Sequence, residues 1–221
     1  MNTNLKKINI LNVGISQLNI EQCIQSISDK IESSSKGYVT VTGAHGLIES
    51  SKSNYIKLIH NNSFLTIPDG MPLVWVSKLK GSKNISRCFG PEMMFQFFRK
   101  TTDSDIKHFF YGGNVGVADE LKQAMELKFP KTKIVGTYCP PFRKLNNEEE
   151  QDLFERVKKT KPDIIWVGLS TPKQEIFMYE YLPKLDTKIM IGTHNGFKYL
   201  FFFNYRAFLR EITRRMSIYC Y

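Results

Sequence analysis

The chain has 221 residues, 42% of them hydrophobic and 24% charged, and its 31 Lys and Arg residues against 21 Asp and Glu residues give a net charge of +10. This size and composition fit a globular domain with a core of its own and exclude collagen-like, coiled-coil and disordered chains. The apolar run that most resembles a membrane segment, residues 199–203, is far shorter than the roughly 20 residues that cross a bilayer. This length excludes a membrane-spanning helix.

Apolar runs alternate with helical patterns along most of the chain. We expect strands, in chain order, over 8–13, 38–42, 64–67, 108–111, 133–135, 163–167 and 188–191. We expect helices over 19–32, 46–60, 71–79, 91–100, 115–128, 147–160 and 172–182. Several strand runs are continuously apolar, which is typical of strands buried on both faces. The alternation therefore predicts an α/β, Rossmann-like sandwich with a mostly parallel sheet, and Asn114 is the expected N-cap of its helix.

The positive charge is uneven and is concentrated at the C-terminus. Arg206, Arg210 and Arg214 are spaced by four, so a helix would carry them on one face, with Phe208 and Ile212 on another. That pattern is typical of a basic amphipathic segment on an anionic membrane, although a surface helix with a solvated basic face has it too. We therefore divide the chain into an α/β domain, residues 1–198, and a short basic appendage, residues 199–221.

Cysteine spacing and the N-terminal sequence predict the compartment. The four cysteines, Cys23, Cys88, Cys139 and Cys220, form no C-x-x-C pair, so neither a zinc site nor a redox motif is expected. The first residues contain no signal-peptide core. We expect a cytoplasmic protein with free thiols.

Small or polar residues follow five of the expected strands. These loops are Gly43-Ala-His-Gly46, Pro68-Asp-Gly-Met-Pro72, Gly112-Gly-Asn-Val-Gly116, Gly136-Thr-Tyr-Cys-Pro-Pro141 and Gly168-Leu-Ser-Thr-Pro-Lys-Gln-Glu175. In parallel sheets, ligands bind beyond the carboxyl ends of the strands. We therefore expect the five loops to open on one side of the sheet and to hold the functional site.

Three of these loops offer chemistry beside a structural alternative. Asp69 can act as a general base, or it can form an Asp-Gly turn or cap the following helix. Gly112 and Gly113 can bring backbone N–H groups to an anion at a helix start, or they can serve a tight turn. His45 can accept a proton or bind phosphate, or it can order its own turn.

Two further side chains are candidates for substrate binding. The amide of Gln174 offers a sugar both donors and an acceptor, although Pro172 before it is also an ordinary helix start. Arg87 can bind a phosphate in bidentate fashion, or it can be an exposed cation without a ligand.

Six blocks, in this order, resemble the WecG/TagA/CpsF glycosyltransferases over roughly residues 8 to 192. The blocks are Thr40-Val-Thr-Gly-Ala-His-Gly46, Ile67-Pro-Asp-Gly-Met-Pro72, Arg87-Cys-Phe-Gly-Pro91, Phe110-Tyr-Gly-Gly113, Val135-Gly-Thr-Tyr138 and Trp166-Val-Gly-Leu-Ser-Thr-Pro-Lys-Gln-Glu175. The resemblance implies inverting transfer of an N-acetylmannosamine-type sugar from a UDP donor to polyprenyl-diphosphate-linked N-acetylglucosamine. Such transfer builds teichoic acid linkage units or exopolysaccharide, and it implies no metal or other cofactor.

The resemblance also assigns roles to residues. Asp69 matches the catalytic base, Thr40 and Gln174 match donor- or acceptor-contacting residues, and Arg87 matches a phosphate or substrate contact. Thr42 stands where many members carry Asn. The remaining substrate-binding candidates are His45, Gly112, Gly113, Gly136, Gly168, Lys173 and Glu175. As partners we expect the UDP-sugar, the lipid-linked acceptor and the anionic inner face of the plasma membrane, and family members self-associate, which leaves a homo-oligomer open.

The sequence departs from the family after the last strand, which keeps an alternative open. Lys198 stands where an Asp is usual, and only a short basic segment follows. A non-catalytic binder of UDP-sugar or lipid diphosphate therefore remains the alternative function. A nucleic-acid partner fits the charge, but the chain has no RNA- or DNA-binding motif, and a dehydrogenase is disfavoured because the full G-x-G-x-x-G fingerprint is missing.

Overall fold

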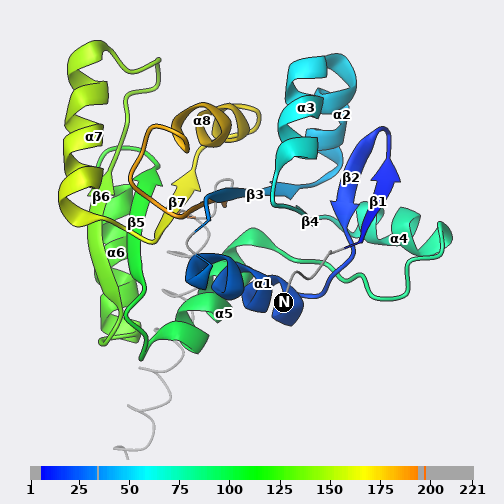
Figure 1. Ribbon diagram of the computed structural model, residues 1–221, viewed down its shortest axis with the longest axis horizontal. Coiled ribbons are helices and arrows are strands. Elements are labelled where there is room, and N and C mark those ends of the chain that lie inside the picture. Colours follow the sequence, from blue (N-terminus) through cyan, green and yellow to red (C-terminus); the bar gives the residue numbers. More distant parts are fainter. Residues whose placement is uncertain (1–5, 34, 194–196, 198–221) are drawn as a thin grey trace, which may run out of the picture.

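The computed structural model describes residues 6–33, 35–193 and 197 (Figure 1). Within these residues the chain forms an α/β sandwich around a six-stranded parallel sheet of order β4-β3-β8-β7-β5-β6. Its strands are β3 (Gly37–Thr42), β4 (Leu65–Pro68), β5 (Lys107–Gly112), β6 (Lys133–Tyr138), β7 (Ile164–Gly168) and β8 (Ile189–Gly192). The predicted Rossmann-like fold is confirmed, and the expected basic appendage lies outside the described residues.

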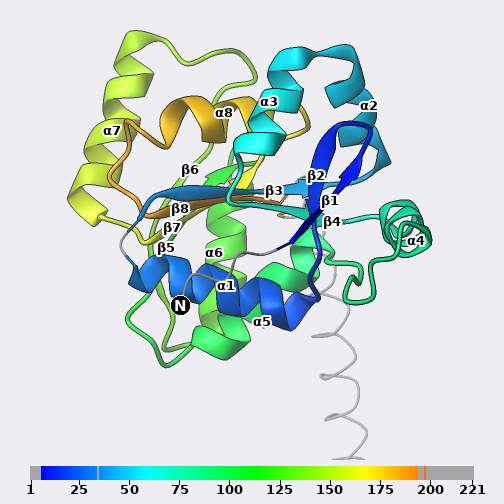
Figure 2. The same cartoon turned by 45° about the vertical axis from the view of Figure 1, so that its right-hand side comes forward.

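Helices cover both faces of the sheet, as Figure 2 shows with the sheet seen almost edge-on. One layer holds α1 (Ile20–Glu32), α5 (Gly90–Thr101) and α6 (Val117–Lys128), and the other holds α3 (Asn54–Asn62), α7 (Asn147–Thr160) and α8 (Lys173–Tyr181). Successive strand residues point to opposite faces. Phe110 and Trp166 therefore face the first layer, and Phe109, Tyr111 and Val167 face the second. Burial on both faces explains the unbroken apolar runs in the sequence.

The first expected strand, 8–13, is wrong because it is a hairpin of β1 (Lys7–Ile10) and β2 (Val13–Ser16). Leu11 and Asn12 form the turn with φ of 51° and 64°, the conformation that two-residue hairpins require. The Asn9 carboxamide oxygen accepts the Asn12 N–H at 3.0 Å and stabilises the turn. The hairpin packs on α4 (Met71–Leu79) and lies against β4, at the far side of the molecule from α7 (Figure 1).

Two helix predictions are also corrected. The single helix expected over 46–60 is two helices, α2 (Ala44–Lys52) and α3, which meet at Ser53 with extended φ and ψ of −132° and 115°. The Ser53 hydroxyl accepts the N–H of Ile56 and begins the second helix. At α6 the N-cap is Gly116, with φ of 87°, and not Asn114.

The core under the first helix layer contains a buried histidine. The His108 ring stacks on Phe98, with centroids 4.2 Å apart, and its Nδ1 accepts the indole N–H of Trp166 at 3.1 Å. Burial lowers the pKa of His108 to about 3. His108 is therefore neutral at ordinary pH and belongs to the core.

Candidate active site at the carboxyl edge of the sheet

Asp69 directly follows β4 and is held from both sides by backbone contacts. Its N–H donates to the carbonyl of Thr42 at 3.0 Å, and its own carbonyl accepts the Nε–H of Arg87 at 2.6 Å. The N–H of Cys88 donates to the carbonyl of Pro68 at 2.8 Å, so the segment before α5 closes over this corner. The N-cap of α4 is Gly70 and not Asp69. The capping alternative for Asp69 therefore does not apply, and the half-buried residue lies at the sheet edge as predicted.

Arg87 is exposed beside this corner, and its guanidinium lies over the Phe89 ring at 4.7 Å. The bond to the Asp69 carbonyl uses one of the five N–H groups that a guanidinium offers. Arg87, a candidate phosphate contact in the sequence, is thus in direct contact with Asp69. This contact places a permanent positive charge beside the Asp69 loop.

Thr40 and Thr42 of β3 lie close to the carboxyl edge of the sheet, and both contact His60. Thr40 and Thr42 are fully buried, and each hydroxyl is 3.2 Å from Nδ1 of His60 on α3. The Thr40 hydroxyl also donates to the carbonyl of Leu65 at 3.4 Å. These contacts fix α3 against β3 and hence the loop beyond it. His60 was not predicted as a site residue, because only the folded chain brings it to the threonines.

His45 lies in the first turn of α2, directly beyond β3, and its side chain is exposed. This turn holds no acidic residue, and its N-cap, Gly43, makes no side-chain cap bond. A Cβ on Gly70 would lie 3.9 Å from the Cα of Gly43, so the start of α2 adjoins the Asp69 loop. The N-terminus of α2 therefore offers backbone N–H groups and an exposed imidazole next to the loop that carries Asp69.

Three glycines meet where β5 and β7 end. Gly112 has φ of 129° and Gly113 has φ of 77°, and a Cβ on Gly112 would lie 2.5 Å from the carbonyl oxygen of Gly168. The N–H of Gly113 donates to that same oxygen at 3.1 Å. From here α6 runs to one face of the sheet and α8 to the other. Such a point, where neighbouring connections diverge, is where a crevice opens in this class of sheet.

Gly136, expected just beyond a strand, lies inside β6, which continues to Tyr138. A Cβ on Gly136 would lie 2.5 Å from Cε2 of Phe109, so glycine makes room for that ring. The structure gives Gly136 a packing role away from the other candidates. Its prediction as a ligand-binding residue gains no support from this position.

Gln174 and Glu175 begin α8 and are both fully buried. The Gln174 amide donates to Oε1 of Glu175 at 2.9 Å, and the Thr171 hydroxyl donates to the same oxygen at 3.1 Å. A Cβ on Gly192 would lie 3.0 Å from the Gln174 amide nitrogen, which places the pair against the end of β8. The two side chains thus lie between the Asp69 corner and the three glycines in the order of the strands.

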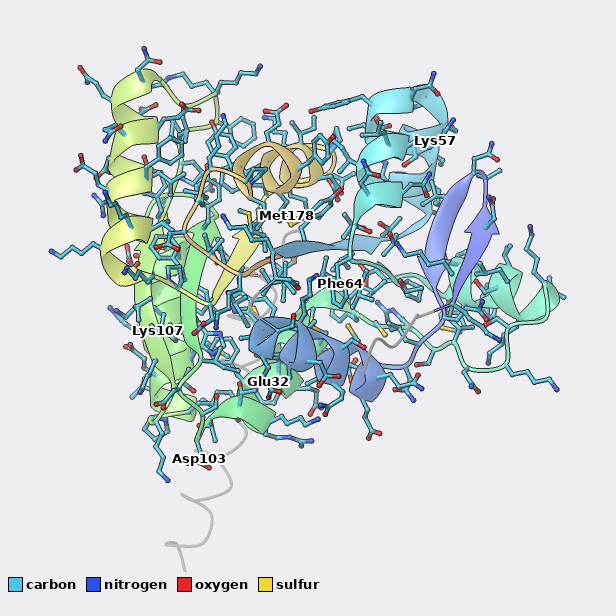
Figure 3. The ribbon with its side chains drawn as sticks, in the orientation of Figure 1. Glu32, Lys57, Phe64, Asp103, Lys107 and Met178 are labelled. Carbon is cyan, nitrogen blue, oxygen red and sulfur yellow. The ribbon has the colours of Figure 1, made fainter. Side chains whose placement is uncertain are left out.

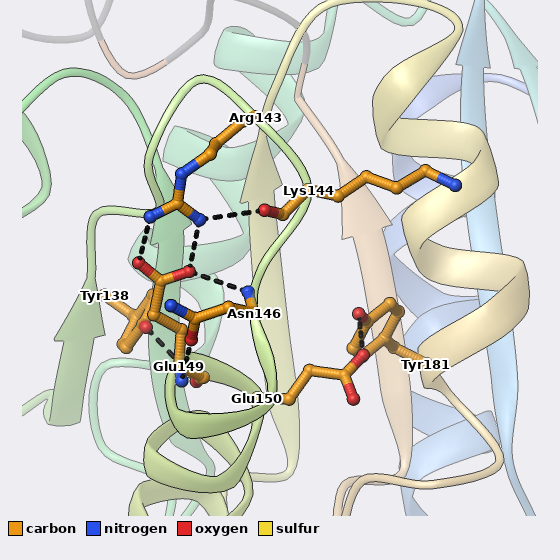
Figure 4. A network of polar contacts seen from close by, with 7 residues as sticks. All are labelled: Tyr138, Arg143, Lys144, Asn146, Glu149, Glu150 and Tyr181. Atoms are coloured by element: carbon orange, nitrogen blue, oxygen red, sulfur yellow. Dashed lines mark hydrogen bonds and ion pairs between the residues drawn. The ribbon is translucent and has the colours of Figure 1, made fainter.

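Lys173 joins the α8 loop to the loop between β6 and α7. Its ammonium lies 4.2 Å from the centre of the Phe142 ring, a side chain that is 88% exposed. Arg143 holds the base of that loop through two bonds to the Glu149 carboxylate, at 2.6 and 2.8 Å (Figure 4). The Arg143 bond, joined by the Asn146 backbone N–H, lowers the pKa of Glu149. Phe142 and Arg143 were not predicted as site residues, because their partners come from different elements.

The N-terminus of α7 completes this corner. Asn146 and Glu149 form a reciprocal capping box, at 2.8 Å in each direction, and Tyr181 donates to Glu150 (Figure 4). Two of the three acids in the first turn of this helix are thus held by these contacts. The loop after β6 is therefore fixed at its α7 end, and its exposed tip faces the Lys173 side.

The candidates spread along the edge and do not form one cluster. In the strand order, β4 is three strand spacings from β7, about 14 Å, and four from β5, about 19 Å. Figure 3 shows how densely side chains fill the space between sheet and helices. A ligand that reaches both Asp69 and the three glycines must therefore be elongated.

The remaining predictions concern metals, membrane spans and thiols. Among residues 6–33, 35–193 and 197, His, Cys, Asp and Glu side chains form no group of three suited to a metal. In the same residues no helix combines the length and apolar character needed to traverse a bilayer. Cys23, Cys88 and Cys139 are free thiols, and burial raises the pKa of Cys88 to about 12, so its thiolate is not accessible near neutral pH. Cys220 lies outside the described residues.

Comparison with known proteins agrees with the resemblance that the six sequence blocks carry. The sequence model of the glycosyl transferase WecG/TagA/CpsF family matches residues 8–200. A Bacillus spizizenii protein named N-acetylglucosaminyldiphosphoundecaprenol N-acetyl-beta-D-mannosaminyltransferase is 26% identical over 159 residues, 72% of this chain and 60% of the relative. Proteins of the same name from two Staphylococcus aureus strains, MRSA252 and NCTC 8325, are 22% identical over 193 residues, 86% of this chain and 74% of each relative. The chain thus spans less than two thirds of the Bacillus relative.

Proposed function

Because the chain belongs to the glycosyl transferase WecG/TagA/CpsF family, we propose that it is an inverting glycosyltransferase. It transfers an N-acetylmannosamine-type sugar from a UDP donor to polyprenyl-diphosphate-linked N-acetylglucosamine, for teichoic acid or another cell-surface polysaccharide. The relatives' names support the sugar and the acceptor, and the motif resemblance supports the UDP donor. The observation that carries the proposal is the position of Asp69, with Arg87 against it, at the carboxyl edge of a parallel sheet.

In this reaction Asp69 takes the proton of the acceptor hydroxyl while that oxygen attacks the anomeric carbon. The bond from that carbon to the donor phosphate breaks, its electron pair leaves with UDP, and the anomeric centre inverts. Arg87 is placed to stabilise the charge that develops on the departing diphosphate. Both groups belong to one corner of the molecule, joined by the Asp69 carbonyl.

Charge at the helix starts supports one site for the diphosphate over another. The first turn of α6 carries Asp119 and Glu120, whereas the first turn of α2 carries no acid. Negative side chains in the first turn disfavour an anion at a helix N-terminus. The start of α2, which carries His45 and adjoins the loop that Arg87 contacts, therefore supports a diphosphate better than the start of α6 does. The turn at Gly112 and Gly113 then contacts an uncharged part of the donor, and Gln174 lies between the two.

A transfer assay tests the proposal. The full chain is incubated with a short-chain lipid-diphosphate N-acetylglucosamine and a panel of UDP-sugars, and we expect transfer from UDP-N-acetylmannosamine. Asp69→Asn should lower turnover by roughly 100-fold or more, as loss of a general base does, and leave UDP binding measurable. The control Asp105→Asn changes an exposed carboxylate that pairs with Lys133, just before β5 at the opposite edge of the sheet. Full turnover in Asp69→Asn would remove Asp69 from the mechanism.

The non-catalytic binder remains distinguishable from the enzyme in the same experiment. Lys198, the departure that favours a binder, lies outside the described residues. Calorimetric binding of UDP by the wild type, with no transfer to any acceptor, would favour the binder. Transfer that depends on Asp69 would exclude it.

A further inference from the structure

Helix α4 leaves one of its faces uncovered by the described residues. Met71, Trp75 and Leu79 are spaced by four, so they form one stripe along the helix, and they are 40%, 58% and 88% exposed. Val76 lies beside the stripe at 37% exposure. The opposite face, with Leu73 and Val74, is buried against the β1–β2 hairpin. Figures 1 and 2 show α4 at the periphery of the molecule, beyond this hairpin.

The charged residues of the segment that carries this stripe are all basic. The segment from Met71 to Asn84 contains Lys78, Lys80 and Lys83, all exposed, and no Asp or Glu. Exposed apolar side chains on other helices, such as Tyr55 and Leu58 on α3 or Leu127 on α6, are pairs or single residues, whereas α4 carries a row of three. Single exposed apolar residues are ordinary, whereas a contiguous patch marks an interaction site.

We propose that this face of α4 docks on the surface of an anionic lipid bilayer. We call it the α4 surface and define it as Met71, Trp75, Val76, Lys78, Leu79 and Lys83. A helix that lies in a bilayer interface places Trp and aliphatic side chains among the acyl chains and lysines among the headgroups. The α4 surface has both parts.

The same charges argue against a second copy of the chain as the occupant. A two-fold dimer through this surface would use the same patch on both copies and would bring the lysines of both α4 helices into one interface. No acidic residue within the segment offsets that repulsion. An anionic bilayer supplies the opposite charge over the whole patch.

The position of α4 in the chain connects this docking to the proposed function, on which this step rests. Asp69 is followed by Gly70, the N-cap, and then by Met71, the first residue of the exposed stripe. Docking of α4 therefore holds the Asp69 loop close to the headgroup layer. The diphosphate of a lipid-linked acceptor lies at that depth, so its sugar can approach the loop while the lipid stays in the bilayer.

Tryptophan fluorescence reports this docking directly. The chain has two tryptophans, and Trp166 is fully buried, so a change on addition of vesicles reports Trp75. With the full chain and vesicles of phosphatidylglycerol and phosphatidylcholine, we expect a blue shift and quenching by acyl chains brominated near the headgroup. Trp75→Phe should abolish both signals. Unquenched Trp75 on vesicles that bind the protein would overturn the proposal, because another segment would then mediate binding.

Matched variants separate the apolar and the basic contributions. Trp75→Ala with Leu79→Ala should weaken vesicle partitioning roughly tenfold or more, whereas Leu127→Ala should not change it. Lys78→Gln with Lys83→Gln should weaken binding by about fivefold per lysine at low salt. The matched control, Lys158→Gln with Lys159→Gln, removes two exposed lysines of α7, on the other side of the molecule.

Two further readouts separate lipid docking from self-association and from loss of sugar transfer. Sedimentation without vesicles should give the same molecular mass for the wild type and for Trp75→Ala with Leu79→Ala. A change of mass without a change in vesicle binding would assign the surface to a second copy and overturn the lipid proposal. Vesicle binding needs no sugar transfer, so it tests the α4 surface even if the chain proves to be inactive.

Discussion

Replacing Gly112 by alanine should lower the stability of the protein by forcing apart the ends of β5 and β7. The φ of 129° at this residue is one that side-chain-bearing residues rarely adopt, and the new Cβ would meet the Gly168 carbonyl oxygen at 2.5 Å and its carbon at 2.7 Å. Both contacts are with backbone, so no side chain can move aside. The ends of β5 and β7 must separate, and the bond from the Gly113 N–H to Gly168, 3.1 Å long, is lost.

Two other glycines separate the contributions of backbone strain and of steric clash to the loss of stability. Gly116 also has a positive φ, of 87°, but a Cβ there meets nothing within 4 Å, so Gly116→Ala should cost about 1 kcal/mol through backbone strain alone. Gly43 has neither constraint, with φ of −104° and open space, and its change to alanine should stay within about 0.5 kcal/mol. For Gly112→Ala the strain, the separated strands and the lost hydrogen bond add to about 3 kcal/mol.

Urea unfolding of the three variants beside the wild type measures these differences in the free energy of unfolding. If the proposed donor site is correct, calorimetric UDP binding at a temperature where all variants are folded should be weaker for Gly112→Ala, because the turn between β5 and α6 is displaced. A Gly112→Ala variant no less stable than Gly116→Ala would refute the predicted clash. Equal stability would mean that the strands adjust to the extra methyl group without losing their contact.

Two stability predictions concern residues away from the site. Burial lowers the folded-state pKa of His108 to about 3, so below pH 6.5 the unfolded chain binds a proton that the folded chain does not. The free energy of unfolding should therefore fall by about 2 kcal/mol between pH 7 and pH 5 through this residue. Chemical unfolding at both pH values checks this, and an undiminished pH slope in His108→Gln would contradict it. Ser53→Ala should cost about 0.5–1 kcal/mol by removing the N-cap of α3. Ser51→Ala, at an exposed position in α2, is its control and should cost less in the same thermal or urea unfolding.

The parallel fold could be predicted because its strands are buried on both faces, which leaves unbroken apolar runs such as that of β7. The hairpin was not predicted because its turn residues, Leu11 and Asn12, include no glycine or proline that would divide the apolar run. The division between α2 and α3 depends on one residue, Ser53, whose capping bond is visible only in the folded chain. Periodicity reports burial well and local turns poorly.

The candidate site was predictable in its location and less so in its details. Strand-end loops must share an edge when strands are parallel, which placed Asp69, Gly112 and Gln174 together on one side. Side-chain direction was not predictable, and the structure directs Thr40 inward to His60. Contacts between distant loops, such as that of Lys173 with Phe142, leave no pattern in either segment alone.

The loop that carries Phe142 is held differently at its base and at its tip. The Arg143–Glu149 pair and the capping box of α7 hold the base. At the exposed tip, the Lys173 ammonium lies over the Phe142 ring, a cation–π contact of about 0.5–1 kcal/mol, and donates to the Phe142 carbonyl at 3.4 Å. These surface contacts are weaker than the burial of the sheet, so the tip can change without a change in the core. For the transferase proposed above, differences in donor preference would then be expected in this loop first.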